Sequence, residues 1–393
     1  MTWKILIPAL FLVCGDPCPD LSISQAVQNP EIPIIRNESG PVCDGPVFDL
    51  IPERVIGRDS GRPEWQIFPQ AVRVWAIGPG NRLYINTSDY PVYISTTRGR
   101  LLGQFGGYGD GPGEYRNPIS FHWIESDGEY WLNDLALNRV TRYSPDGEVL
   151  GIISYHEMRD DWGYLIHLRD RRFLGLRDKH IDGHPYQIIG MLDEDLNWDR
   201  EVLTVRFPDF DSRAMMLESG RGLVFPYPPA YPVVKSFPDG RFVLIHAVEG
   251  SLTYYSIEGT PLFRVQDCFE FPRVTREDRN RWLADIEARR PEDLPAARRL
   301  QFPERYGAFW NAFTDDSGRL WLQQHKAIYN AAGDRIAYKY YIVDRDGRLL
   351  GEQTFEFEPR HIRISGNLLY WSDEGGEDIG PRIRVYRLDP EYQ

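Results

Sequence analysis

Short apolar runs that directly follow tight turns recur six times along most of the chain. The turns are Gly80-Asn81, Asp127-Gly128, Asp170-Arg171, Asp239-Gly240, Ser317-Gly318 and Gly366-Asn367, and the runs after them are RLYI, EYWL, RFLGL, RFVLI, RLWL and LLYW. Most of these turns contain glycine or asparagine, which accept the positive φ angles of a two-residue hairpin loop. Each copy therefore predicts two antiparallel strands, which we name a and b.

A second turn, followed by another strand-like run, occurs in each of the first five units. These turns lie at Arg98-Gly99, Asp146-Gly147, Asn197, Glu258-Gly259 and Asp346-Gly347. They predict two further strands, c and d, so that one unit has four strands. A unit of this kind that repeats every several dozen residues is typical of a β-propeller, and the number of copies predicts six blades.

The sixth unit is incomplete, because no fourth strand follows its third before Gln393. The run from Pro46 to Gly57 is strand-like and has no blade of its own. We expect this run to pair beside Arg382 to Leu388, which would close the ring and leave no open sheet edge between the first and last blades. The predicted fold is therefore an all-β, six-bladed propeller over residues 47–389.

One segment breaks the repeat between strand d of blade four and strand a of blade five. Thr275 is a residue type that caps helices, Trp282 and Ile286 fall on one helical face, and Pro291 ends the pattern. The segment predicts a helical insertion over residues 276–300. Two interpretations stay open. The insertion is either a lid or partner-binding ledge on the face that carries the b–c loops, or a helix packed on the rim. We call the face that carries the b–c loops the top face.

The N-terminus differs from the rest of the chain. Lys4 precedes the mostly apolar run Ile5 to Val13, which predicts an export signal over residues 1–14. Residues 15–46 are rich in Pro, Ser, Asn and Asp and predict a flexible tether. We expect an exported protein, either periplasmic or anchored in the outer membrane.

Cysteines leave two questions open. Cys14 follows the apolar run and resembles the lipid-attachment box of bacterial lipoproteins, but Val13 stands where that box has a small residue, so lipidation at Cys14 and simple secretion both remain possible. An exported chain could oxidise two of Cys18, Cys43 and Cys268. Cys18 with Cys43 is one pairing, and the alternative is that the cysteines are isolated. No CxxC pair or Cys/His cluster has the spacing of a structural zinc site.

Composition narrows the range of partners. Aromatic residues make up 13% of the chain, which favours strands, and the formal net charge is −13. An acidic chain lacks the general basic character that nucleic-acid backbones require, so we expect no nucleic-acid partner. Contact with a membrane is expected only through a lipid on Cys14.

The second blade carries a resemblance to a known family. The segment NDLALNRVTRYSPDG resembles NHL-type propeller repeats, and the match is carried by Asp134, Asn138, Arg139, Val140, Tyr143 and Gly147. Just before it, GGYGDGPGEYRNP is similar to the linker of bacterial six-bladed propeller lipoproteins. The resemblance implies a propeller architecture. Its relatives include ligand-binding lipoproteins, protein-interaction modules, lactonases and amidating lyases, so it does not decide the function.

Site candidates follow from the expected architecture, in which strand a lines the centre and the b–c loops lie on the top face. The candidate ligand-binding residues are Arg73, His122, Asp134, His167, Lys235, Asn311, His361 and Asp373. The loops also offer Asn133, Asp178, His180, His184, His325 and Glu374. Asp134 has an alternative role, since the corresponding NHL-type residues pin the b–c loop.

Three of these candidates permit a metal hypothesis. His122, His167 and His361 lie on strand a of different blades, and neutral imidazoles that converge could hold a divalent cation. The alternative for each is a packing or hydrogen-bonding role. We favour a non-enzymatic protein that binds a small molecule, a glycan or a protein at the top face. The alternative is a metal-dependent lactonase or lyase with its site in the central channel.

Overall fold

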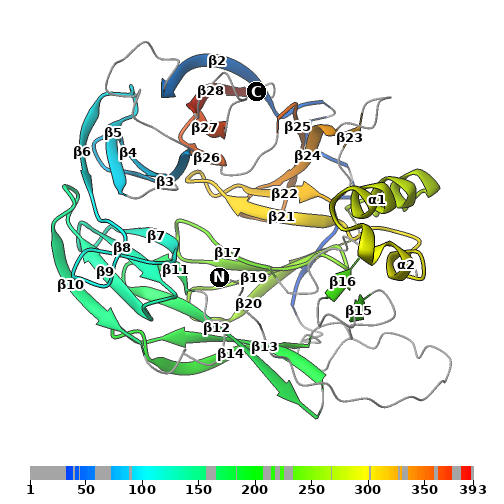
Figure 1. Cartoon of the computed structure of the whole chain (residues 1–393), viewed down its shortest axis with the longest axis horizontal. Coiled ribbons are helices and arrows are strands. Elements are labelled where there is room, and N and C mark those ends of the chain that lie inside the picture. Colours follow the sequence, from blue (N-terminus) through cyan, green and yellow to red (C-terminus); the bar gives the residue numbers. More distant parts are fainter. Residues whose placement is uncertain are drawn as a thin grey trace.

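The computed structural model is a ring of six β-sheet blades, as the sequence predicted (Figure 1). It describes residues 32–38, 40–43, 45–57, 72–87, 91–155, 165–182, 184–206, 214–216, 222–224, 233–266, 268–300, 302–325, 328–329, 335–357, 362–373 and 382–390. The predictions for the export signal, for residues 15–31 of the tether, and for Cys14, Cys18, His361 and Glu374 lie outside these residues.

Each blade is a sheet of antiparallel strands whose first strand is innermost. Blade four also gains a short parallel strand at its outer edge, and blade five contains a short extra strand. Blade one holds β3 (Val72–Gly78), β4 (Arg82–Thr87), β5 (Val92–Thr96) and β6 (Leu101–Phe105). Blade two holds β7 (Pro118–Ile124), β8 (Glu129–Asp134), β9 (Arg139–Tyr143) and β10 (Val149–Ser154). Blade three holds β11 (Leu165–Arg169), β12 (Arg172–Ile181), β13 (His184–Leu192) and β14 (Trp198–Arg206).

The later blades follow the same plan. Blade four holds β17 (Val233–Ser236), β18 (Phe242–His246), β19 (Ser251–Tyr255) and β20 (Pro261–Val265). Blade five holds β21 (Phe309–Thr314), β22 (Leu320–Gln324), β24 (Arg335–Val343) and β25 (Leu349–Phe355), with the short β23 (Ile328–Tyr329) paired to β24. Blade six holds β26 (Ile362–Ser365), β27 (Leu368–Asp373) and β28 (Arg382–Pro390). A separate hairpin consists of β15 (Ala214–Met216) and β16 (Gly222–Val224).

The fourth strand of blade six comes from the start of the folded region, which confirms the predicted ring closure. Strand β2 (Phe48–Gly57) pairs antiparallel with β28, from Phe48 opposite Pro390 to Gly57 opposite Arg382. Ile56 is buried against blade one, because it belongs to the cluster that includes Leu83 and Ile85. Strands β2 and β28, which come from opposite ends of the propeller sequence, therefore share one sheet and close the ring.

The segment before β2 runs along the outside of two more blades. Strand β1 (Ile34–Ile35) adds to blade four, parallel to β20. The backbone N–H groups of Val42 and Cys43 then donate to the carbonyls of Leu349 and Leu350 in blade five. The described residues between 32 and 47, most of which the sequence assigned to a flexible tether, are thus held by backbone hydrogen bonds. The physical reason is that outer strands offer unpaired backbone groups, which even a short, irregular segment can satisfy.

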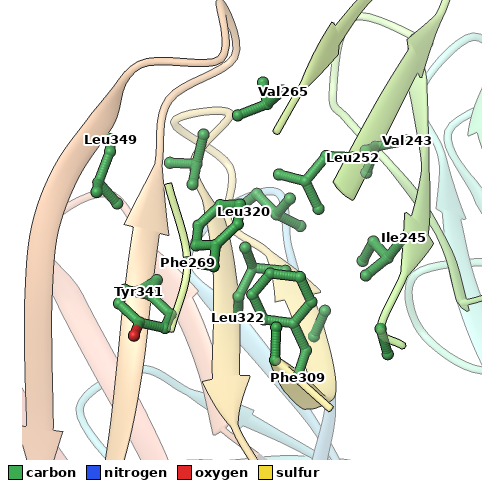
Figure 2. Packing of buried hydrophobic residues seen from close by; sticks show 14 of the residues in the cluster. Val243, Ile245, Leu252, Val265, Phe269, Phe309, Leu320, Leu322, Tyr341 and Leu349 are labelled. Atoms are coloured by element: carbon green, nitrogen blue, oxygen red, sulfur yellow. The ribbon is translucent and has the colours of Figure 1, made fainter. Parts of the chain in front are cut away.

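Apolar side chains fill the seams between blades. Strand residues alternate in direction, so each blade packs one set of side chains against the blade before it and the other set against the blade after it. Figure 2 shows the seam between blades four and five, where Val243, Ile245 and Leu252 meet Leu320 and Leu322. This packing holds the six innermost strands at fixed positions around the axis.

The predicted insertion is present between β20 and β21. It consists of α1 (Arg276–Arg289), a 3₁₀ turn (Pro291–Asp293) and α2 (Leu294–Ala297). Thr275 and Asp278 cap α1 with reciprocal hydrogen bonds, and Ile286 is buried in a small cluster of its own. Seen along the axis, both helices lie at the periphery of the ring and not over its centre, as expected for a helix on the rim (Figure 1).

Among the described residues, no helix is both long and apolar enough to cross a membrane.

Candidate functional site

One layer of residues recurs at the same position in all six innermost strands. In each blade, the third residue after the a–b turn lies on strand b and pairs with one residue of strand a. We call these strand-a partners the axial layer: Ala76, His122, Ile166, Lys235, Phe313 and Arg363. Because the blades are repeats arranged around one axis, residues at equivalent positions lie at similar depth in the ring.

Basic and apolar residues alternate around this layer. Blades two, four and six contribute His122, Lys235 and Arg363, whereas the three blades between them contribute alanine, isoleucine and phenylalanine. The three basic residues are thus spaced evenly around the ring. The chain as a whole carries a net charge of −13, so this concentration of basic side chains is a local reversal of the overall charge.

Electrostatic interactions link these residues across the ring. Burial lowers the pKa of Lys235 to about 8, and the nearby charge of Arg363 lowers it further. Burial also lowers the pKa of His122 to about 3, with further contributions from His167 and Arg363. Arg363 therefore acts on residues two blades away in both directions. Its own pKa is lowered by burial, although its side chain keeps contact with solvent.

Lys235 has no acidic partner in the part of the chain that the structure describes. Among the described residues, the only charged neighbour with an effect on its pKa is Arg363. The Nε2 atom of His122 is also buried without a hydrogen-bond partner among the described residues. Unpaired buried polar atoms are uncommon in folded proteins, and a bound water or ion is one explanation for them.

His167 lies beside this layer and not within it. Its ring centroid is 5.6 Å from that of His122, but it pairs one register position further along, opposite Phe173. Its Nε2 atom lies 2.7 Å from the carbonyl oxygen of Asp170, in the a–b turn of its own blade. Burial lowers the pKa of His167. This histidine is therefore neutral near pH 7 and already has a hydrogen-bond partner.

Two other strand-a candidates lie away from the axial layer. Asn311 is exposed, lies near the start of β21 and pairs with Gln323. The side chain of Asn311 accepts a hydrogen bond from the backbone N–H of Ala312. Arg73 lies on β3 opposite Asn86, also towards the start of the strand, and its side chain is outside the described residues. Both positions fall at the top-face end of the innermost strands.

Asp134 has a structural role in blade two. It is fully buried, and its carboxylate accepts hydrogen bonds from the backbone N–H groups of Arg116, Asn117, Ala136 and Leu137. Arg139 donates to the carbonyls of Asp110, Gly111 and Glu114, which fixes the linker before the blade. This is the loop-pinning role considered from the sequence, and it leaves the Asp134 carboxylate little capacity to contact a ligand.

The remaining loop candidates do not join the axial layer. Asp373 accepts hydrogen bonds at 2.8 and 2.9 Å from Arg382 and Arg384, both on the neighbouring strand of its own blade. Asn133 accepts a hydrogen bond from Tyr155. His180 is exposed at the end of β12. His325 packs against Tyr306 and edge-on against Trp310 at the top of blade five, and Trp310 is 43% exposed.

The metal hypothesis finds two of its three histidines together. His122 and His167 are neighbours, while His361 lies outside the described residues. Across the described ranges, no group of three or more His, Cys, Asp or Glu side chains is placed to hold a metal ion. The charge of Arg363, which lowers the pKa of His122, would also repel a cation. The local field therefore suits an anion better than a metal.

Sequence reasoning missed Arg363, the residue that links the layer electrostatically. It selected His361, two positions earlier on the same expected strand, because histidine is a common ligand. Counting from the turn could have found Arg363. It pairs with the third residue after Gly366-Asn367, and His122 and Lys235 hold the same position in their blades.

The fold has known counterparts, whereas the sequence matches no family model and no curated protein. A "Putative exported protein" from Bacteroides fragilis aligns with a TM-score of 0.51 at 12% identity, covering 91% of this chain and 99% of that one. A member of the DUF4221 family from Bacteroides vulgatus aligns with a TM-score of 0.47 at 11% identity, over 88% and 99%. A gluconolactonase from Xanthomonas campestris gives 0.41 at 11%, over 88% and 99%. At such low identities the likeness shows the propeller fold alone.

Proposed function

We propose that this chain is an exported, non-enzymatic binding propeller that captures a small anionic molecule, with the acidic group of the ligand held at the axial layer. The observation that carries the proposal is the position of Lys235. Its ammonium group lies in a largely buried site near a second cation, Arg363, and no acidic residue among those described raises its pKa. A buried charge without a counter-ion is costly, so an anionic ligand would relieve the cost.

The surroundings suit a binding protein that is open at its top face. The b–c loops and the exposed Asn311 and Trp310 lie at that end of the innermost strands, where polar and aromatic contacts can recognise the rest of a small molecule. The helical insertion stays at the periphery, so it does not cover the axis. A glycan or a protein bound at the top face would not need the basic residues of the axial layer. Replacing these residues therefore distinguishes an anionic ligand from a glycan or a protein.

Export is part of the same proposal. It is supported by the apolar run Ile5 to Val13 after Lys4, and the Bacteroides fragilis counterpart is also described as exported. A lipid on Cys14 would anchor the protein to a membrane. Mass spectrometry of the protein purified from membranes tests this point, because Cys14→Ser would remove a diacylglyceryl mass and release the protein to the soluble fraction. An unmodified, cleaved chain would show simple secretion instead.

Binding is tested with the full mature protein by isothermal titration calorimetry at constant ionic strength. Citrate and gluconate serve as acidic probes and glucose as the neutral control. We expect binding of at least one acidic probe, and a loss of about tenfold or more in Lys235→Met and in Arg363→Met, since each removes a charge-assisted contact. The matched controls are Lys179→Met and Arg100→Met, two exposed positions in blades three and one.

Three outcomes would contradict the proposal. Equal affinity for glucose and gluconate would show that charge is not recognised. Unchanged affinity in both axial variants would place the ligand elsewhere. Stoichiometric metal in the purified protein, lost when His122 is replaced, would favour the alternative of a metal-dependent lactonase or lyase.

A further inference from the structure

We propose that His122, Lys235 and Arg363 form a three-sided site on the axis of the propeller that holds one tetrahedral oxyanion group, a phosphoryl or sulfuryl group. This inference rests on the proposed function and names the chemistry of the ligand. It starts from the register of the innermost strands. The three basic residues share one register position and occupy every second blade.

The spacing of the donors decides the shape of the ligand group. Three donors distributed evenly around an axis can each contact one oxygen of a tetrahedral anion whose fourth oxygen points along the axis. A carboxylate is planar and has only two oxygens, so it cannot offer one oxygen to each of three evenly spaced donors. The intervening residues Ala76, Ile166 and Phe313 pack in the seams with neighbouring blades and offer no hydrogen bond from their side chains, so side-chain contacts are restricted to three directions.

The three donors have different roles. Lys235 and Arg363 supply the charge, and the arginine can contact more than one oxygen. His122 is neutral near pH 7, so its imidazole serves as a hydrogen-bond donor and adds no third charge. Its ring packs edge-on against Phe173 with centroids 5.9 Å apart, which limits its rotation. Two charges with one neutral donor match a dianion such as sulfate.

The experiment compares sulfate and acetate as probes by isothermal titration calorimetry of the full mature protein, with ionic strength held constant by sodium chloride. We expect sulfate to bind at least tenfold more tightly than acetate. His122→Asn should weaken sulfate binding about tenfold and leave acetate binding unchanged, because acetate needs only the two charged sides. Lys235→Met should weaken the binding of both anions.

The matched control is His167→Asn, which alters the neighbouring imidazole outside the axial layer and should change neither affinity. His122→Gln is a second variant in case His122→Asn does not fold, and thermal unfolding checks both. Inorganic phosphate and glucose 6-phosphate extend the series and compare a free ion with an ester. Either order of their affinities supports the three-sided site, since both carry the tetrahedral group.

Acetate binding as tight as sulfate, or a His122→Asn variant that binds sulfate like the unaltered protein, would overturn the three-sided site while leaving an anion-binding propeller intact. Binding of citrate or gluconate without any binding of sulfate or phosphate would have the same meaning. A protein that binds no anion at all would overturn both this inference and the proposed function.

Discussion

The charge of Arg363 on β26 lowers the pKa of Lys235 on β17, although the two residues belong to blades that are separated by a third. Two like charges that act on one another destabilise the folded chain unless a counter-ion offsets them. The arrangement is therefore informative about function, because packing alone would favour an apolar residue at the largely buried position of Lys235.

Replacing Lys235 by methionine should stabilise the protein. The pKa of Lys235 in the folded state is about 8, below its ordinary value, so the charged form at pH 7 opposes folding. Methionine keeps most of the aliphatic stem and removes the charge. We expect the free energy of unfolding at pH 7 to rise by about 2 kcal/mol in Lys235→Met, measured by urea denaturation without added anion. A lower stability than that of Lys179→Met would contradict this reading.

Anion affinity should fall as the pH rises through 8. Several strands place titratable or charged groups near Lys235. His167 and Arg169 lie on β11, His246 lies on β18, and Arg363 acts across the axis. The sequence of β21 has no titratable residue. Lys235 has a pKa of about 8, so its ammonium is charged below that pH and neutral above it. Sulfate affinity should drop about tenfold between pH 7 and pH 9.

The conservative variant Lys235→Arg tests the source of that drop. Arginine stays charged over the whole range, so the fall in sulfate affinity should disappear while binding at pH 7 is kept. Sulfate is used because its own charge is constant between these pH values. A parallel fall in both proteins would assign the pH dependence to another group.

Removing the Asp134 carboxylate should destabilise blade two. Asp134→Ala leaves four backbone N–H groups without their acceptor, and we expect a loss of about 3 kcal/mol in the free energy of unfolding. The control is Asp146→Ala, whose carboxylate is exposed and pairs with Arg82 at 2.7 Å, and which should cost less than about 1 kcal/mol. Equal effects in the two variants would show that the buried hydrogen bonds are not decisive.

Strand β2 should be indispensable for the ring. A chain that begins at residue 58 lacks the outer strand of blade six and the buried Ile56, so we expect it to aggregate or to lose cooperative unfolding. A chain that begins at residue 32 keeps every described contact and serves as the control. Cooperative unfolding of the shorter chain at the same temperature as the control, measured by circular dichroism, would refute the role of β2.

The sequence was sufficient for the ring because its determinants are local. The turn residues and the apolar runs fix each hairpin, and the unpaired run before Gly57 implied the closing strand that the structure contains. The path of residues 32–47 was not predictable in this way. Those residues show little periodicity, and their hydrogen bonds depend on outer strands that are more than two hundred residues away.

The candidate site was predicted only in part. His122 and Lys235 were selected from their strands, and the structure places both in the axial layer. Arg363 was missed because convergence around an axis depends on register, which a list of residue types does not contain. Asp373 was selected for its position in a loop, but the pairing of β27 with β28 brings two arginines onto its carboxylate.

The path of the N-terminal segment also sets the order in which contacts would break under a mechanical pull. A pull on residue 32 acts first on β1, which has only two paired residues on blade four, then on the contacts of Val42 and Cys43 with blade five, and last on the ten residues of β2. Blades four and five can thus lose their outer layer while the ring stays closed. The segment before β2 would absorb extension before the fold itself is loaded.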